Sequence, residues 1–138
     1  MNLVVGSSWR RFATVLTGLC ASLLCAATFI GSAHAASSIF GTTGSNPYAI
    51  TIDSAGNIYT ANQGSNNVSK ITPGGTSTTL GTTGTTPFGI TVDSAGNIYT
   101  ANVGSTNVTK ITPGGTSTIL GATGWNPIGI TVDSAGNI

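Results

Sequence analysis

Aspartate is the only acidic residue type in this chain, and its three copies stand forty residues apart at Asp53, Asp93 and Asp133. Acid–base catalysis or divalent-metal binding needs at least two such groups close together. A repeat with one aspartate per unit separates them, so we expect no catalytic residue, no metal site and no cofactor. Each aspartate leads the segment Asp-Ser-Ala-Gly-Asn, in which the carboxylate accepts backbone amides and the glycine takes a positive φ. The residues predicted to cap these turns are Asp53, Asp93, Asp133, Gly56, Gly96 and Gly136.

The other reactive side chains lie in an N-terminal segment of different composition, and they are Cys20, Cys25 and His34. In this segment Arg10 and Arg11 precede an uncharged apolar run, and the small-residue site 33–35 follows it. This order is typical of a secretory signal peptide, so we predict a signal helix at residues 1–35, exported by general secretion and not by the twin-arginine route. The alternative is an uncleaved membrane anchor, because the apolar run from 12 to 30 is long enough to span a bilayer.

Cleavage after residue 35 leaves two lysines and three aspartates as the only charged side chains, with no cysteine for a disulfide. A chain with so little charge has no electrostatic footprint for nucleic acid, and its stability rests on packing and strand pairing. We therefore expect an exported protein, located in the periplasm, at the cell surface or outside the cell. Nucleic acid is not an expected partner, and after cleavage the membrane is not one either.

A forty-residue unit sets the positions of the aspartates. It occupies residues 41–80 and 81–120 and stops within a third copy, 121–138. Periods of this length are typical of solenoids, propellers and other arrays. Each full copy contains four runs of alternating polar and β-branched or aromatic residues, bounded by turn residues. In the second copy these runs are 88–93, 97–102, 107–112 and 116–120.

The turn chemistry distinguishes two architectures for this repeat. The alternative architecture is a β-solenoid, whose strands are joined by wide corners. The segment Asp-Ser-Ala-Gly-Asn is instead a tight reversal, which pairs neighbouring strands antiparallel. Four antiparallel strands per unit predict an all-β fold, a β-propeller built from four-stranded blades.

Three segments share a core close to Pro-x-Gly-Ile-x-Val-Asp-x-x-Gly-Asn-Ile, at 46–62, 86–102 and 126–138. This core resembles the NHL repeat of bacterial propellers, and segments 67–72 and 107–112 resemble the third strand of that repeat. The resemblance implies a six-bladed propeller used mostly as a binding scaffold. It also implies a relation in shape to gluconolactonase-like enzymes and virginiamycin B lyase.

The length of the repeat region departs from the pattern of that family. Six blades of about 40 residues each need on the order of 240 residues, and residues 36–138 hold far fewer. We therefore predict an incomplete propeller of about two and a half blades at 36–138, and we interpret the sequence as a truncated product or a partial one. In the alternative interpretation, copies of the chain associate through their open blade edges.

Comparison of the first two copies identifies the variable positions, because thirty-one of their forty positions are identical. The less conservative differences lie in loops between strands, where a propeller usually presents its recognition surface. Trp125, which lies just before a turn, is the best single candidate for contacting a ligand. The predicted ligand-binding residues are Asn46, Gln63, Thr86, Val103 and Trp125.

Other repeated side chains have structural interpretations. Tyr59 and Tyr99 are predicted to pack between blades, since aromatic residues favour strands. Lys70 and Lys110, one per copy, are predicted to be solvated. The Asn-Val-Ser and Asn-Val-Thr segments fit a glycosylation sequon, but their place at the start of a repeating strand argues against modification.

Two functions from different classes fit these observations. The favoured one is a non-catalytic exported propeller that binds protein, peptide or glycan through its blade loops. The alternative is a fragment of a lactonase- or lyase-like propeller enzyme whose catalytic residues lie in other blades. Further copies without histidine and glutamate would favour the scaffold, whereas inward-facing clusters of those residues would favour the enzyme.

Overall fold

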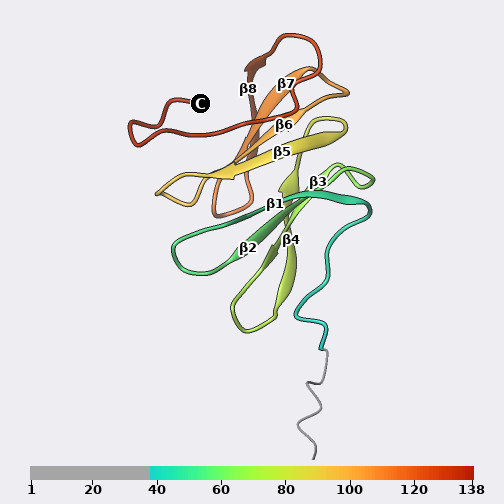
Figure 1. Cartoon of the computed structure of the whole chain (residues 1–138), viewed down its shortest axis with the longest axis vertical. Helices are drawn as coiled ribbons and strands as arrows, with labels where there is room; N and C mark the ends of the chain where they lie inside the picture. The colour runs from blue at the N-terminus through green and yellow to red at the C-terminus, as the bar shows by residue number, and fades with distance from the viewer. Residues whose placement is uncertain (1–37) are drawn as a thin grey trace, which may run out of the picture. The chain divides into compact units, whose positions relative to one another are not determined.

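A computed structural model describes residues 38–138, so the predicted signal peptide at 1–35 lies outside the described residues. The described part contains eight β-strands and no helix, and they form two four-stranded sheets (Figure 1). No helix in this part is long and apolar enough to cross a membrane. The predicted all-β class and the four-stranded antiparallel blades are therefore confirmed.

Each sheet is built from one copy of the repeat, with its strands in the order of the sequence. The first sheet consists of β1 (Pro47–Ile52), β2 (Ile58–Asn62), β3 (Asn67–Ile71) and β4 (Ser77–Thr82). The second sheet consists of β5 (Pro87–Val92), β6 (Ile98–Asn102), β7 (Asn107–Ile111) and β8 (Ser117–Ala122). Every neighbouring pair is antiparallel.

The strand ends differ from the predicted runs by one or two residues, for physical reasons. Asp93 and Asn97 belong to the β5–β6 turn, because the Asp93 amide donates to the Asn97 carbonyl oxygen at 3.0 Å. Strand β8 continues beyond Leu120 to Ala122, because a register shift opposite Val108 and Thr109 keeps it paired with β7.

The third copy forms its turn but no strand within the described residues. The Gly136 amide donates to the Asp133 carbonyl oxygen at 3.1 Å, as the equivalent residues do in the other two copies. Residues 127–132 pair with no described strand and run beside β5 (Figure 1). The approach is close, since a Cβ built on Gly89 would lie 2.6 Å from the Ile128 carbonyl oxygen. Glycine is therefore the residue that fits at position 89.

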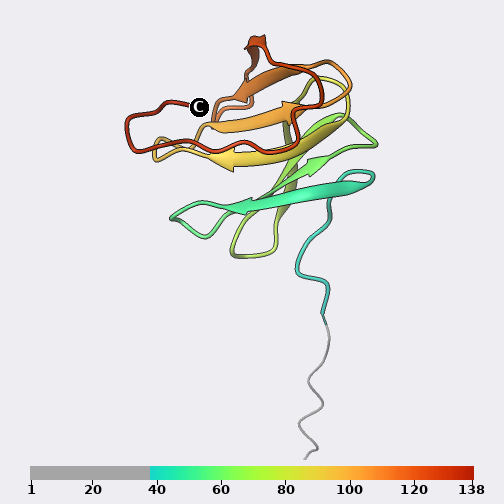
Figure 2. The same cartoon turned by 45° about the horizontal axis from the view of Figure 1, so that its top comes forward.

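The core lies between the two sheets, which pack face to face (Figure 2). The first sheet contributes what we call its trailing face, and the second sheet contributes its leading face. The buried residues of this interface are Tyr59, Ala61 and Val68 on the trailing face, with Ile90, Ile98 and Ile111 on the leading face. Burial of each isoleucine contributes about 1.5–3 kcal/mol. The predicted packing of Tyr59 between blades is confirmed by its place in this cluster.

Candidate functional site

The antiparallel order places two kinds of connection at opposite ends of each sheet. The hairpin turns 53–57 and 72–76 lie at one end, which we call the turn end. The β2–β3 loop 63–66 and the connection 83–86 lie at the other end, which we call the loop end. The predicted capping residues therefore lie at the turn end, and all five predicted ligand-binding residues lie at the loop end.

At the turn end, each aspartate is fully occupied by its own hairpin. Asp53 Oδ1 accepts from the amides of Ala55 and Asn57 at 3.0 and 2.8 Å. Its Oδ2 accepts from Asn57 Nδ2 at 2.8 Å and from the Tyr59 hydroxyl at 2.9 Å. Gly56 completes the turn with φ of 81°. The carboxylate thus has its oxygens committed to four donors.

These contacts set the protonation state of the pair. Burial raises the pKa of Asp53, but the hydrogen bonds from Asn57, Tyr59 and Ala55 outweigh it, so the net pKa lies below the ordinary value. Burial, followed by the hydrogen bond to Asp53 and its charge, raises the pKa of Tyr59 to about 12. Both groups therefore keep their ordinary charge states at neutral pH, and neither is tuned for proton transfer.

The same arrangement recurs in the other copies. Asp93 accepts from Ala95, Asn97 and Tyr99, and Asp133 accepts from Ala135 and Asn137. Residues 38–138 contain no group of three or more side chains able to hold a metal ion.

The lysines have a defined contact as well as solvent. Lys70 Nζ lies 5.8 Å from the centroid of the Tyr59 ring, and Lys110 Nζ lies 5.7 Å from that of Tyr99. Cation–π contacts of this kind contribute about 0.5–1 kcal/mol at exposed sites. The prediction of purely solvated lysines missed this contact, because it depends on the β2–β3 register that pairs Tyr59 with Lys70.

At the loop end, the structure brings four of the predicted ligand-binding residues together in pairs. The Gln63 amide donates to the carbonyl oxygen of Asn46 at 2.9 Å. In the next blade, the Val103 amide donates to the carbonyl oxygen of Thr86 at 3.0 Å. The Thr86 amide itself donates to Asn66 Oδ1 at 2.8 Å, which joins the loop ends of the two blades. The loop ends of the two blades are thus linked by hydrogen bonds.

The backbone conformation adds a constraint that the sequence comparison did not reveal. Asn46, Thr86 and Asn126 occupy equivalent positions with φ of 51°, 58° and 56°. Asn66 and Thr106 form a second such pair, with φ of 50° and 48°. Asparagine tolerates this left-handed region, whereas it is strained for a β-branched residue. An exchange between asparagine and threonine at these positions therefore changes the backbone strain as well as the surface chemistry.

Trp125 is the most exposed of the predicted ligand-binding residues. It lies in the connection that follows β8, with 89% of its surface accessible. Gln63, Thr86 and Val103 are half-buried, and Asn46 is exposed. The structure thus has one exposed aromatic ring, that of Trp125, at the end of the blades where the variable residues are paired.

Sequence reasoning missed the buried asparagines, Asn62 and Asn102, that hold the loop end in place. Asn102 is fully buried, and its Nδ2 donates to Asn107 Oδ1 at 2.8 Å and to Thr109 Oγ1 at 2.9 Å. Thr109 Oγ1 also accepts from the Gly84 amide at 3.1 Å, which ties the connection 83–86 to the sheet. The available signal was an asparagine at the end of a strand in both copies, where this residue is disfavoured.

This network also includes side chains of the apparent glycosylation sequon in the second copy. Asn107 Oδ1 accepts from Asn102 and from the Ser105 hydroxyl, and Thr109 is 2% exposed. The sequon side chains are therefore engaged within the blade.

The sheets, their order and their face-to-face packing define the described part as blades of an incomplete β-propeller. Among solved structures, the chain is similar to virginiamycin B lyase from Staphylococcus aureus, in a catalytically inactive histidine-to-alanine variant with quinupristin. The TM-score is 0.58 at 25% identity, over 67% of this chain and 33% of that chain. A streptogramin B lyase structure gives a TM-score of 0.54 at 25% identity, over 63% of this chain and 30% of that chain.

A selenomethionine-substituted virginiamycin B lyase from Staphylococcus aureus gives a TM-score of 0.53 at 25% identity, over 63% of this chain and 31% of that chain. The chain therefore spans about a third of the length of these lyases. Neither the protein-family models nor the curated proteins give a match. The likeness supports the propeller fold, and assignment to the NHL family stays a prediction.

Proposed function

We propose that this chain is part of a non-catalytic, exported propeller scaffold that binds a neutral polar ligand at its loop end. The observation that carries the proposal is the pairing of Asn46 with Gln63, and of Thr86 with Val103, at the same end of the blades as the exposed Trp125. The aspartates, which are the only acids, lie at the opposite end and are committed to their turns.

The chemistry of the loop end suits a glycan or a peptide without charge. It offers amide and hydroxyl groups on backbone held by hydrogen bonds, together with one indole ring. Preorganised polar groups lose little entropy on binding, and a free indole gives a large apolar surface for stacking. Electrostatic attraction contributes little, because the described residues carry two lysines and three aspartates.

Two finer assignments belong to the same proposal. The repeats are of the NHL type, on the motif shared by 46–62 and 86–102. The protein is exported through the predicted signal peptide, which places the loop end where extracellular or periplasmic glycans and peptides are available.

The test begins with a glycan array and a peptide array probed with the chain, followed by titration of the best ligand by isothermal titration calorimetry. Trp125→Ala should weaken binding by about tenfold or more, since loss of an exposed aromatic anchor costs about 1.4 kcal/mol or more. Ser54→Ala, an exposed change at the turn end, serves as the matched control and should leave affinity unchanged. Equal affinity of Trp125→Ala and the original chain would contradict the proposed site.

The alternative function is lyase-like, and the likeness to streptogramin lyases is the observation that favours it. The histidine-to-alanine variant of virginiamycin B lyase is catalytically inactive, and residues 38–138 of this chain contain no histidine. We expect incubation with quinupristin to give no new peak in reversed-phase chromatography. Appearance of a converted product, separated by chromatography and identified by its fragment ions, would favour the lyase-like function over the scaffold.

A further inference from the structure

The first sheet has an open leading face. Ile50 and Ile52 on this face are 68% and 61% exposed, whereas the equivalent Ile90 of the second sheet is 9% exposed. The difference arises because Ile90 packs on the trailing face of the first sheet. The chain therefore presents, on β1, a copy of a surface that it buries elsewhere against a blade.

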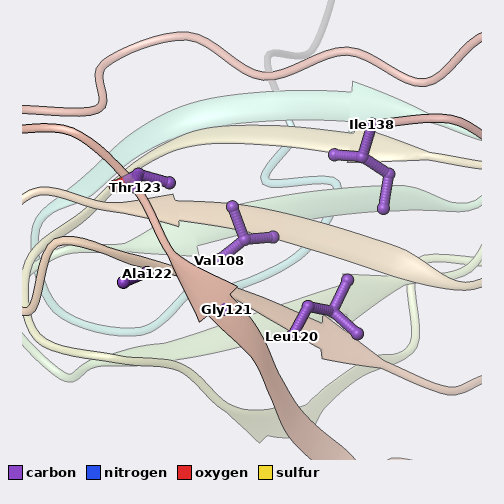
Figure 3. Close-up of a pocket in the computed structure, with 6 residues that line it drawn as sticks. All are labelled: Val108, Leu120, Gly121, Ala122, Thr123 and Ile138. Carbon is purple, nitrogen blue, oxygen red and sulfur yellow. The ribbon is translucent and has the colours of Figure 1, made fainter.

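The second sheet has a hollow on its trailing face. The hollow has a volume of about 260 Å³, and it lies between Val108, Leu120 and Ile138 (Figure 3). Gly121, Ala122 and Thr123 complete its lining. In the first sheet, the equivalent residue Val68 is fully buried.

Gly121, at the edge of this hollow, can be compared with the equivalent glycines of the chain, Gly41 and Gly81. A Cβ on Gly81 would lie 2.7 Å from Ile111 Cγ2, and one on Gly41 would lie 2.5 Å from Ile71 Cγ2. A Cβ on Gly121 would meet no atom of residues 38–138 within 4 Å. By this comparison, the hollow is the site that an isoleucine from the third strand of a neighbouring blade would occupy.

We propose that a second copy of this chain fills this hollow. The open leading face of the second copy would dock on the trailing face of the second sheet of the first copy. Ile71 of the second copy would enter the hollow, as Ile111 does within the chain. Ile50 and Ile52 would take the places of Ile130 and Val132, which hold the equivalent positions in the third copy of the repeat. The interface would repeat the one already present between the two sheets.

Docking requires two segments to be displaced. Residues 127–138 now cover part of the trailing face as a segment that pairs with no described strand, and the incoming blade carries the same apolar positions in a paired four-stranded sheet. Residues 39–41 of the second copy correspond to residues 119–121 of the first, so β8 of the first copy would replace them. The exchange substitutes one copy of the repeat for another and keeps the side chains in contact nearly the same.

The head-to-tail geometry of this contact determines the size of the assembly. The two faces differ, so the contact is head-to-tail and generates a ring or a filament. Each copy brings two full blades, and propellers close with about four to eight. The expected particle therefore contains about two to four copies.

The test uses the full chain and measures its mass by size-exclusion chromatography with light scattering. Ile50→Asp places a charge on the leading face, and Leu120→Asp places one at the hollow; both side chains are exposed, so both variants should fold, as circular dichroism will show. Each variant alone should be monomeric. Ser54→Asp, which adds a charge at the turn end, is the control and should leave the original oligomer intact.

Mixing the two blocked variants distinguishes head-to-tail docking from other association. The intact leading face of Leu120→Asp should bind the intact trailing face of Ile50→Asp, giving a heterodimer that does not grow further. Association that persists in either variant alone, including association through residues 1–37, would overturn the proposal. A monomeric original chain, or a mixture that stays monomeric, would overturn it too and would leave a blade of different origin as the occupant.

Discussion

Replacement of Asp93 by alanine tests whether the repeated aspartate is a structural capping residue. Asp93→Ala removes acceptors for the amides of Ala95 and Asn97, for Asn97 Nδ2 and for the Tyr99 hydroxyl. The Ala95 amide is exposed and regains water. Tyr99 is 5% exposed, so its hydroxyl loses its partner where water is scarce. A buried unsatisfied donor costs about 1–3 kcal/mol, and with the lost turn bonds we expect about 2–4 kcal/mol less stability.

Tyr99→Phe provides the control for this substitution. It removes the hydroxyl that donates to Asp93 Oδ2 at 3.0 Å and leaves the other donors of the turn in place. Adding Tyr99→Phe to Asp93→Ala should recover about 1 kcal/mol or more, because it removes the unsatisfied donor.

The assay is urea unfolding followed by circular dichroism, at one fixed protein concentration and at several pH values. Burial raises the pKa of Asp93, but its hydrogen bonds outweigh this, so the folded-state pKa lies below the ordinary value of 3.8. The stabilisation is therefore present above pH of about 4 and is lost as the pH falls through the folded-state pKa. No recovery on adding Tyr99→Phe to Asp93→Ala at neutral pH, or a loss of stability in Asp93→Ala that persists in strong acid, would refute the capping argument.

Three further predictions follow from features of the blades. Thr86→Asn and Thr106→Asn should each raise the free energy of unfolding by about 1 kcal/mol by relieving left-handed strain; no gain in urea unfolding would contradict the strain. Gly81→Ala should destabilise by about 1–3 kcal/mol, because its Cβ would crowd Ile111. Made in the monomeric Ile50→Asp variant, the matched change Gly121→Ala should be nearly neutral in the same assay, and equal effects would count against the packing described. The pKa of Tyr59 is raised to about 12, so its bond to Asp53 should stabilise the fold fully below the ordinary pKa of 10.0. This stabilisation should be lost as the pH rises from 10.0 to about 12. Tyr59→Phe should flatten this alkaline fall in unfolding experiments, and an unchanged fall would assign it to another group.

The sequence was sufficient for features that depend on neighbouring residues. The strands and their antiparallel order follow from alternating runs and from a turn whose Asp and Gly fix the local backbone. Pairing of Asn46 with Gln63 could not be predicted, because it depends on how the connection before β1 crosses the β2–β3 loop. Burial of Asn102 and the strain at Thr86 depend likewise on contacts between distant segments. The sequence therefore placed the candidate residues in loops but did not show which of them meet.

The identity of the two sheets has a consequence for how the chain folds. Strands β2 and β6 have the same sequence, and β3 differs from β7 at one position, so β2 could pair with β7 in nearly native register. The connection from Asn62 to Asn67 closes over four residues, whereas that from Asn62 to Asn107 would close over forty-four. The longer closure costs about 2 kcal/mol more in chain entropy. Because the strands are consecutive, the correct partner of each strand is also its nearest one, and short connections protect a repetitive chain from mispairing its own copies.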